Sequence, residues 1–127
     1  MNVVDSSAWL EYFADGPNAS FFARAIERPL DLVVPTLSLY EVFKRILQER
    51  GETEALRKIA LMQQGTVVDL TADLALSAAK LSSGTGLPMA DSIMLASARA
   101  VGATLWTQDA DFDGIPDVRF VPARPRA

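Results

Sequence analysis

Residues 3–10 read Val-Val-Asp-Ser-Ser-Ala-Trp-Leu, a pattern in which a short apolar strand passes directly into a helix. The two valines begin the strand, which ends at Asp5. Ser6 or Ser7 can cap the helix, because a serine hydroxyl accepts a hydrogen bond from a free N–H in the first turn. The segment therefore predicts a β–α unit with a carboxylate at the carboxyl end of its strand.

The same alternation of strand and helix continues along the chain. Further strands are predicted at 32–34, 66–68, 104–107 and 118–121. Strands this short and this apolar are typical of a parallel sheet that is covered on both faces. We therefore expect a three-layer α/β/α sandwich, in which ligands bind at the carboxyl ends of the strands. The predicted helices begin at Ser6 or Ser7, Pro17, Thr36 or Ser38, Thr53, Thr71 and Pro88, and they end at Gly16, Pro29, Arg50, Gln64, Ser83 and Val101.

Length and composition predict a single folded domain. The chain has 127 residues, of which 50% are hydrophobic and 22% charged. Roughly two-thirds of the surface of a chain of this size is buried on folding, which is enough for a core without disulfides or metals. We expect one domain over residues 1–127, with a frayed tail over 122–127.

Two residue types are missing, and their absence restricts the chemistry. The sequence contains no cysteine and no histidine. This excludes histidine-based triads, imidazole zinc sites and thiolate metal sites. A catalytic metal ion would have to be held by oxygen ligands, which points to Mg²⁺, Mn²⁺ or Ca²⁺.

The net charge is −4, so bulk charge alone does not indicate a nucleic-acid-binding protein. That argument weakens if several carboxylates share a metal site, because bound cations neutralise them. The longest uncharged stretches have ten residues (59–68 and 81–90), too short to span a membrane. The N-terminus lacks the features of a signal peptide, so we expect a cytoplasmic protein without membrane contact.

Two carboxylates invite different interpretations when each is taken alone. Asp5 is most simply a helix N-cap, in competition with Ser6. Asp91 lies near the start of a helix that is apolar on nearly all sides, so we expect it to be buried. Burial of an unpaired carboxylate costs several kcal/mol, whereas a favourable helix-dipole interaction at a surface contributes at most ~1 kcal/mol. This comparison favours a functional role for Asp91.

The remaining acidic residues give weaker signals. Spacing alone does not single out Glu41, which is placed to form an i,i+4 pair with Arg45 worth ~0.2–0.5 kcal/mol. The segment Asp109–Asp113 opens like a calcium-binding EF-hand loop. The twelfth position, however, is Phe120 instead of a glutamate, and strands instead of helices flank the segment. Calcium binding of that type is therefore disfavoured, and a solvated acidic turn is the simple alternative.

Taken together, the carboxylates indicate a metal site. Asp5 and Asp109 end strands and Asp91 begins a helix, so all three can meet at one edge of a doubly wound sheet. Their mutual repulsion is tolerable if divalent cations bind there, an arrangement suited to phosphoryl transfer to water. A receiver domain would need a lysine after the last strands, and none follows Lys80. A haloacid-dehalogenase-type phosphatase would need D-x-D after the first strand, where the chain has Asp5-Ser-Ser.

Four blocks of sequence carry a resemblance to a known family. They are Val-Val-Asp-Ser-Ser-Ala-Trp-Leu (3–10), Leu-Tyr-Glu-Val (39–42), Thr-Gly-Leu-Pro-Met-Ala-Asp-Ser-Ile (85–93) and Thr-Gln-Asp-Ala-Asp-Phe (107–112). In this order and at this chain length, the blocks resemble PIN domains, specifically the VapC-type toxin ribonucleases of bacterial toxin–antitoxin pairs. The resemblance runs from Val3 to about Val121.

The resemblance implies a PIN-like fold with a five-stranded, mainly parallel sheet and a metal site at its edge. It implies that Mg²⁺ or Mn²⁺ is the cofactor, and it assigns Glu41 a role that spacing could not. Ser6 and Thr107 are expected to form hydrogen bonds to the carboxylates, and Asp111 is expected to face solvent or substrate. The implied catalytic and metal-binding residues are Asp5, Glu41, Asp91 and Asp109.

The implied activity is metal-assisted hydrolysis of an RNA phosphodiester, with tRNA or ribosomal RNA as the substrate. The first candidates for contact with the RNA backbone are Lys44 and Arg45, and the further candidates are Arg24, Arg28, Arg119, Arg124 and Arg126.

The implied partners are a VapB-type antitoxin and a second copy of the chain, in a homodimer and in toxin–antitoxin hetero-oligomers. Trp9, Tyr12 and Phe13 are candidates for antitoxin contact, within an aromatic patch that exceeds what a small core can bury. A basic antitoxin side chain is expected to enter the carboxylate cluster. Two alternatives remain open: a non-catalytic PIN-like module that binds metal or a partner, and an antitoxin-independent nuclease of RNA processing or repair.

Overall fold

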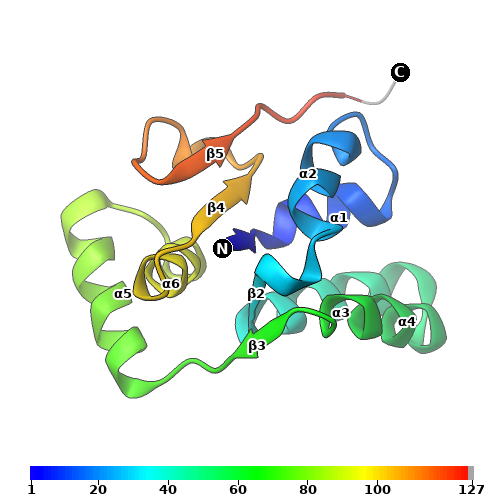
Figure 1. Cartoon of the computed structure of the whole chain (residues 1–127), viewed down its shortest axis with the longest axis horizontal. Helices are drawn as coiled ribbons and strands as arrows, with labels where there is room; N and C mark the ends of the chain where they lie inside the picture. Colours follow the sequence, from blue (N-terminus) through cyan, green and yellow to red (C-terminus); the bar gives the residue numbers. More distant parts are fainter. Residues whose placement is uncertain (126–127) are drawn as a thin grey trace.

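The computed structural model describes residues 1–125 and is built on a five-stranded sheet. The strand order is β3-β2-β1-β4-β5, and all neighbouring strands are parallel (Figure 1). The strands are β1 (Asn2–Val4), β2 (Leu32–Pro35), β3 (Thr66–Val68), β4 (Thr104–Thr107) and β5 (Val118–Phe120). The α-helices are α1 (Ser6–Phe13), α2 (Ala19–Ile26), α3 (Thr36–Arg50), α4 (Glu52–Met62), α5 (Ala72–Thr85) and α6 (Met89–Ala100), and the 3₁₀ helices are η1 (Pro29–Asp31) and η2 (Ala110–Phe112).

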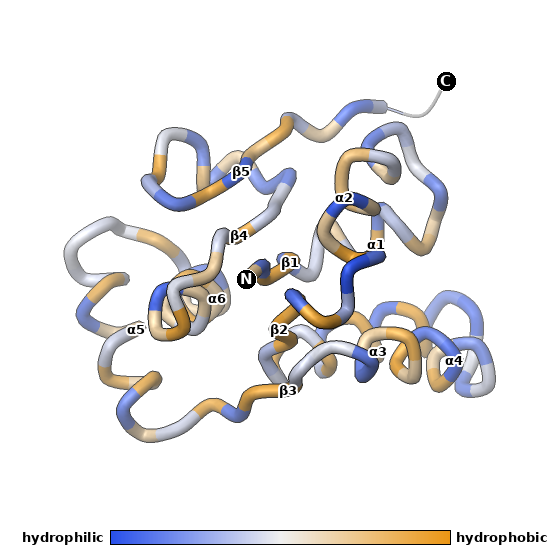
Figure 2. Tube along the Cα trace, in the orientation of Figure 1, coloured by the Kyte–Doolittle hydropathy of each residue, from blue (hydrophilic) through white to orange (hydrophobic). Residues whose placement is uncertain are grey.

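Helices cover both faces of this sheet, which confirms the three-layer α/β/α architecture. Helices α1 to α4 lie on one side and α5 and α6 on the other (Figure 1). Consecutive strand residues point to opposite faces, so Val4 and Trp106 pack under α1 to α4, whereas Val3 and Leu105 pack under α6. Burial on both sides explains why the inner strands β1 and β2 are largely apolar, as their orange colouring shows in Figure 2, whereas the edge strand β3 is mostly exposed.

The two large buried aromatic rings near the N-terminus correct one expectation. Trp9 and Phe22 are fully buried in the core on the α1–α4 side. Trp9 stacks on Phe13 with ring centroids 5.5 Å apart, and Phe13 is partly exposed. The core therefore accommodates more of these aromatic residues than the sequence suggested, and Trp9 is not part of an exposed patch.

Helix boundaries differ from the predicted ones by up to three residues. Helix α2 begins at Ala19 instead of Pro17, and a separate 3₁₀ turn forms at residues 29–31. Strand β2 includes Pro35, one residue beyond the predicted strand at 32–34. Helix α5 continues to Thr85 and ends at Gly86, whose positive φ of 77° favours glycine. The predicted cap of α5 is confirmed, since the Thr71 hydroxyl accepts a hydrogen bond from the Leu74 N–H at 3.2 Å.

The C-terminal segment is attached to the domain as far as Arg124. Asn18 is buried and donates to the Pro122 carbonyl at 3.0 Å, while its own side-chain oxygen accepts from Arg124 at 3.1 Å. These contacts differ from the expectation of a frayed tail for that stretch. Residues 126–127 lie outside the described residues.

We predict opposite effects on stability for two glycine-to-alanine substitutions. At Gly65, just before β3, a Cβ would lie 2.9 Å from the Leu32 carbonyl oxygen and 3.0 Å from Val34 Cγ2. Gly65→Ala should therefore lower the free energy of unfolding by ~1–3 kcal/mol. At Gly84, within α5, an added Cβ has no atom within 4 Å. Because alanine favours a helix more than glycine does, Gly84→Ala should raise the free energy of unfolding by ~0.5–1 kcal/mol. Urea denaturation of both variants measures the difference, and equal effects would contradict the packing described for β2 and β3.

Candidate active site at the carboxyl edge of the sheet

Asp5 follows β1 and is the most deeply buried of the predicted carboxylates, with 5% of its surface exposed. It occupies the N-cap position of α1, yet its side chain caps no helical N–H. Its Oδ2 instead accepts hydrogen bonds from Thr107 Oγ1 at 3.0 Å and Ser7 Oγ at 2.9 Å. The simple N-cap interpretation is therefore wrong, and the carboxylate is fixed between the ends of β1 and β4.

Burial raises the pKa of the Asp5 carboxyl, and the nearby charge of Glu41 adds to the increase. The hydroxyls of Ser7 and Thr107 act in the opposite direction, because hydrogen bonds to the oxygens stabilise the ionised form. Burial is the largest of these effects. A cation that binds close to the Asp5 carboxylate would therefore stabilise its ionised form.

Glu41 comes to the same edge from the middle of α3. Ser6 Oγ donates to Glu41 Oε1 at 2.7 Å, which joins the start of α1 to α3. The i,i+4 pair with Arg45 does not form, because Arg45 pairs with Glu49 instead. The hydrogen-bonding partner of Glu41 lies 35 residues away in sequence, so spacing within the helix could not have revealed it.

Three further carboxylates form a compact group beside Asp5. Oxygen atoms of Asp91, Asp109 and Asp111 lie within 4.8 Å of one another. Burial, then repulsion from Asp109 and Asp5, and then hydrogen bonding to Asp111 raise the pKa of Asp91 to about 7. Asp91 is only partly buried, which corrects the expectation of a core position: the buried residues of α6 begin at Ser92, while Asp91 lies in its first turn at the sheet edge.

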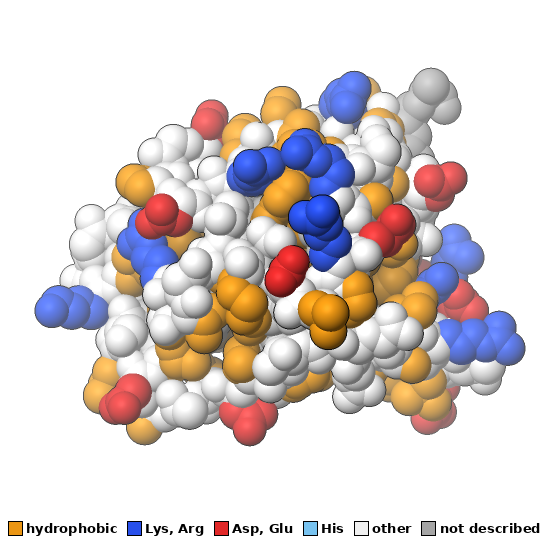
Figure 3. Space-filling model, in the orientation of Figure 1, with side chains coloured by type: hydrophobic (Ala, Val, Ile, Leu, Met, Phe, Trp, Pro, Cys, Tyr) orange, Lys and Arg blue, Asp and Glu red, His pale blue; other side chains and the backbone are white. Residues whose placement is uncertain are grey.

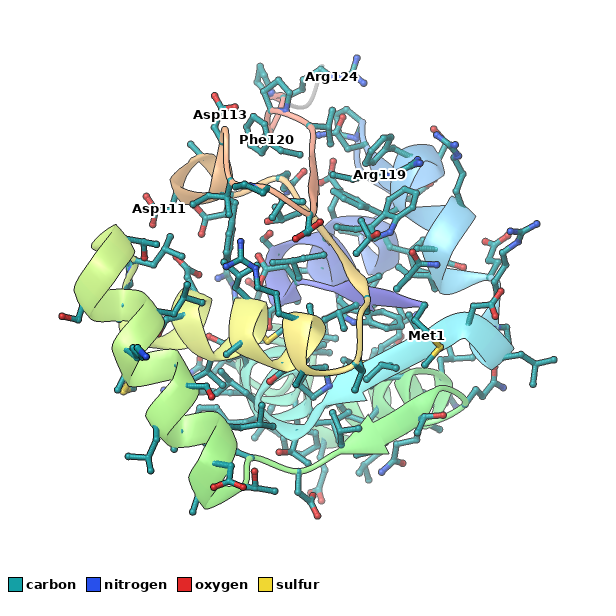
Figure 4. All side chains as sticks on the ribbon, turned by 60° about the vertical axis from the view of Figure 1, so that its left-hand side comes forward. Met1, Asp111, Asp113, Arg119, Phe120 and Arg124 are labelled. Carbon is teal, nitrogen blue, oxygen red and sulfur yellow. The ribbon has the colours of Figure 1, made fainter. Side chains whose placement is uncertain are left out.

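The turn after β4 explains how Asp109 and Asp111 approach each other. The Asp109 N–H donates to Thr107 Oγ1 at 3.0 Å, and the Asp111 N–H donates to Asp109 Oδ1 at 2.9 Å. The 3₁₀ helix η2 then carries Asp111 at the exposed rim of the group (Figure 4). The sequence predicted a position facing solvent or substrate for Asp111, and the structure adds that it lies among the potential metal ligands.

The donor set fits a hard divalent cation. The potential ligand atoms of Asp91, Asp109 and Asp111 are carboxylate oxygens, and burial together with their repulsion raises the pKa of Asp91 to about 7. Two further carboxylates are close enough to interact with this group. The charge of Asp5 raises the pKa of Asp91, and the charge of Glu41 raises the pKa of Asp5. The structure thus brings the four predicted residues and Asp111 to one edge, while their roles as metal ligands stay predictions.

The sequence interpretation missed one contributor and misjudged another. Ser7 donates to Asp5 but was considered only as a helix cap; a serine two residues after a strand-ending aspartate was the available signal. Trp9, predicted to contact a partner, is buried, with 1% of its surface exposed. Tyr12 remains at the surface, where its hydroxyl donates to Glu27 at 2.8 Å.

A pocket of about 390 Å³ lies close to the carboxylate edge, between α1, α3 and α4. Its walls include Ser7, next to the site, together with the apolar side chains Leu10, Phe13 and Ile46. Arg45, one of the predicted RNA contacts, also lines this pocket and is paired with Glu49. The other predicted contact, Lys44, is exposed, with its ammonium 5.8 Å from the Tyr40 ring.

Comparison with known proteins defines the family. A model of the PIN domain matches residues 3–118, so the chain belongs to the PIN domain family. No curated protein sequence matches it significantly. Within residues 1–125, none of the helices is long and apolar enough to cross a membrane.

Several solved structures share the fold at low sequence identity. A toxin–antitoxin complex from Klebsiella pneumoniae superposes with a TM-score of 0.81 at 21% identity, over 94% of this chain and 96% of that one. The Mycobacterium tuberculosis toxin VapC20, described as cleaving the sarcin–ricin loop, gives 0.75 at 22% identity over 98% and 100%. VapBC2 of Rickettsia felis, bound to a promoter DNA fragment, gives 0.71 at 15% identity over 95% and 97%.

The raised pKa values of Asp5 and Asp91 predict that the metal-free protein loses stability as the pH rises. A carboxyl whose pKa is higher in the folded state binds its proton more tightly there, so folding is favoured at low pH. For Asp91 this contribution declines between pH values near 3.8 and about 7. The midpoint of thermal unfolding in EDTA should therefore fall from pH 5 to pH 8.

Asp91→Asn should reduce that fall, because the amide does not titrate. Asp69→Asn removes an exposed carboxylate between β3 and α5, and should leave the fall unchanged. The chain has no histidine, so few other groups titrate in this range. A thermal midpoint that is constant from pH 5 to pH 8 in wild-type protein would contradict the described carboxylate environment.

Proposed function

We propose that the chain is a divalent-metal-dependent endoribonuclease that acts as the toxin of a toxin–antitoxin pair. The observation that carries this proposal is the convergence of Asp5, Glu41, Asp91, Asp109 and Asp111 at one sheet edge. Membership of the PIN domain family supports a nuclease, and the solved toxins that share the fold support the biological role.

The protein's own residues hold and orient the acidic site. Asp5, Glu41, Asp91 and Asp109 would bind Mg²⁺ or Mn²⁺, which when bound supplies charge neutralisation at the phosphate and a lower pKa for the attacking water. The hydroxyls of Ser6, Ser7 and Thr107 fix the carboxylates through hydrogen bonds of 2.7–3.0 Å. Asp111, at the exposed rim, is placed to contact the incoming water or substrate.

The reaction is hydrolysis of an RNA phosphodiester. Water attacks phosphorus, the bond to the 3′ oxygen breaks, and that oxygen takes up a proton, so the products carry a 5′-phosphate and a 3′-hydroxyl. Structured RNAs of the translation machinery are the proposed substrates, a choice supported by the sarcin–ricin loop named for VapC20. We place the activity in the cytoplasm, where these RNAs occur, and in a single domain over the whole chain.

An antitoxin of the VapB type is the proposed inhibitor, within a hetero-oligomer that contains a toxin homodimer. The toxin–antitoxin complex from Klebsiella pneumoniae and VapBC2 of Rickettsia felis, which share the fold, support the choice of partner. The pocket between α1, α3 and α4 offers the apolar side chains of Leu10, Phe13 and Ile46 to an amphipathic segment. Because this pocket adjoins Ser7, the same segment can place a basic side chain among the carboxylates.

The decisive prediction concerns metal-dependent cleavage. Purified protein should cut total tRNA or ribosomal RNA in Mn²⁺ or Mg²⁺ and not in EDTA. Loss of a residue that merely orients a metal ligand costs ~10–100-fold, so Asp5→Asn and Asp91→Asn should each lower the rate by more than about 100-fold. Gel analysis of the products against the Asp69→Asn control measures this.

A growth assay separates hydrolysis from binding. Expression of wild-type protein should arrest growth, and expression of the Asp91→Asn variant should not. Arrest that persists in this variant, together with no cleavage by wild-type protein in any metal, would contradict the nuclease and favour the non-catalytic binding module. Full cleavage activity of the Asp91→Asn variant in vitro would show that catalysis does not require Asp91.

A further inference from the structure

A second pocket, of about 440 Å³, lies at the opposite edge of the sheet and has a basic lining. It is formed by Asn2 and Thr104, which begin β1 and β4, and by Trp106, Arg24, Arg28 and Arg119. No acidic residue lines it in the described part of the chain. Three arginines gathered in one pocket are unexpected in a chain with a net charge of −4.

The indole of Trp106 organises two of these arginines. The guanidinium carbons of Arg119 and Arg24 lie 4.9 and 5.7 Å from the indole ring, on which they form cation–π contacts. The indole is itself fixed, because its N–H donates to Asn2 Oδ1 at 2.8 Å. Contact through the face of a guanidinium leaves the N–H donors in its plane free, so these donors are held ready for an acceptor.

Within residues 1–125, the guanidinium groups of these arginines have no protein acceptor. Among residues 1–125, Arg24, Arg28 and Arg119 take part in none of the ion pairs or side-chain hydrogen bonds. Other arginines differ in this respect: Arg124 donates to Asn18 and Arg57 lies 3.8 Å from Glu54. Clustered positive charges that lack counter-charges repel one another, and a bound anion would relieve that repulsion.

Phosphate is the anion that best matches this lining. A guanidinium fork donates two parallel hydrogen bonds to a phosphate, and the Thr104 hydroxyl and the Asn2 amide nitrogen can add neutral donors. Figure 3 shows the Lys and Arg side chains around an apolar centre on this face. Trp106 is only 5% exposed, so the pocket offers charge for a backbone and no free ring face on which a base could stack.

We propose that this pocket binds backbone phosphates of the RNA, at a distance from the bond that is cut. This proposal rests on the proposed function for its choice of RNA. Figure 4 shows Met1 and Arg119 on one side of the molecule and Asp111 on the other. Strand β4, at ~3.3 Å per residue, runs between the two edges, so an RNA that contacts both sites is held at two separate points.

The test measures RNA binding separately from cleavage. On an Asp91→Asn background, Arg28→Gln and the double change Arg24→Gln/Arg119→Gln are compared with Arg57→Gln, an arginine on α4 away from the pocket. Filter binding of labelled total tRNA over a range of salt concentrations is the measurement. Arg28 makes no contact with the Trp106 ring, so Arg28→Gln removes charge without disturbing that packing.

Each pocket variant should weaken tRNA binding roughly tenfold and reduce the slope of log K against log salt by about 0.7–0.9 per lost phosphate contact. Arg57→Gln should change neither quantity. Titration with inorganic pyrophosphate should shift the indole N–H resonance of Trp106 in wild-type protein and less in the double variant.

Unchanged tRNA affinity and salt slope in the pocket variants would overturn the proposal, whether or not the wild-type protein cleaves RNA. Weakened tRNA binding with an unchanged slope would also overturn it, because loss of structure alone has that signature. If pyrophosphate shifts the indole signal but tRNA affinity is unaffected, the pocket takes a small phosphate compound, and the choice of RNA is wrong. Absence of cleavage by wild-type protein would instead count against the nuclease alone.

Discussion

The repulsion among carboxylates that meet at the carboxyl ends of β1 and β4 is the constraint on which the site depends. Asp5 is buried there, and the hydroxyls of Ser7 and Thr107 hold its charge in place. Asp109 and Asp91 lie at the same edge, and burial together with repulsion from Asp109 and Asp5 raises the pKa of Asp91 to about 7. The fold tolerates this arrangement because the remaining strand residues pack into two apolar cores. A divalent cation would relieve the repulsion, so the cost in stability and the proposed activity have the same origin.

Much of the fold could be predicted from the sequence, because strand and helix signals here are local. The run Thr66–Val68 consists of three β-branched residues, is short enough to belong to a strand, and follows Gly65, which stops the preceding helix. The α5 cap is local as well, since Thr71 and Leu74 are three residues apart. The depth of burial was harder to predict. Trp9 is inside and Asp91 is only partly buried, and both outcomes depend on how helices dock on the sheet.

The site was predictable to the extent that its residues follow strands or begin helices. Asp5 and Asp109 could be located from topology alone, because parallel strands end at the same edge. Glu41 could not be located from topology, because it lies in the middle of α3 and contacts Ser6 of α1, a helix that only the folded chain brings close. Arg24, Arg28 and Arg119 were among the sequence's further candidates for RNA contact, but their position in one pocket was not predictable, because it depends on the packing around Trp106. The molecule thus has an acidic and a basic edge, suited to a cation and to a polyanion respectively.

The central claim is that the acidic edge binds a divalent cation, and calorimetric titration of Mn²⁺ into the purified, metal-free protein tests it most directly. We expect saturable binding that releases protons at pH 7, because a carboxyl group with a pKa of about 7 must ionise to become a ligand. The Asp91→Asn variant should bind Mn²⁺ far more weakly and release fewer protons, while Asp69→Asn should behave like wild type. Wild-type protein that shows no saturable heat, or an Asp91→Asn variant that binds as tightly as wild type, would contradict the account.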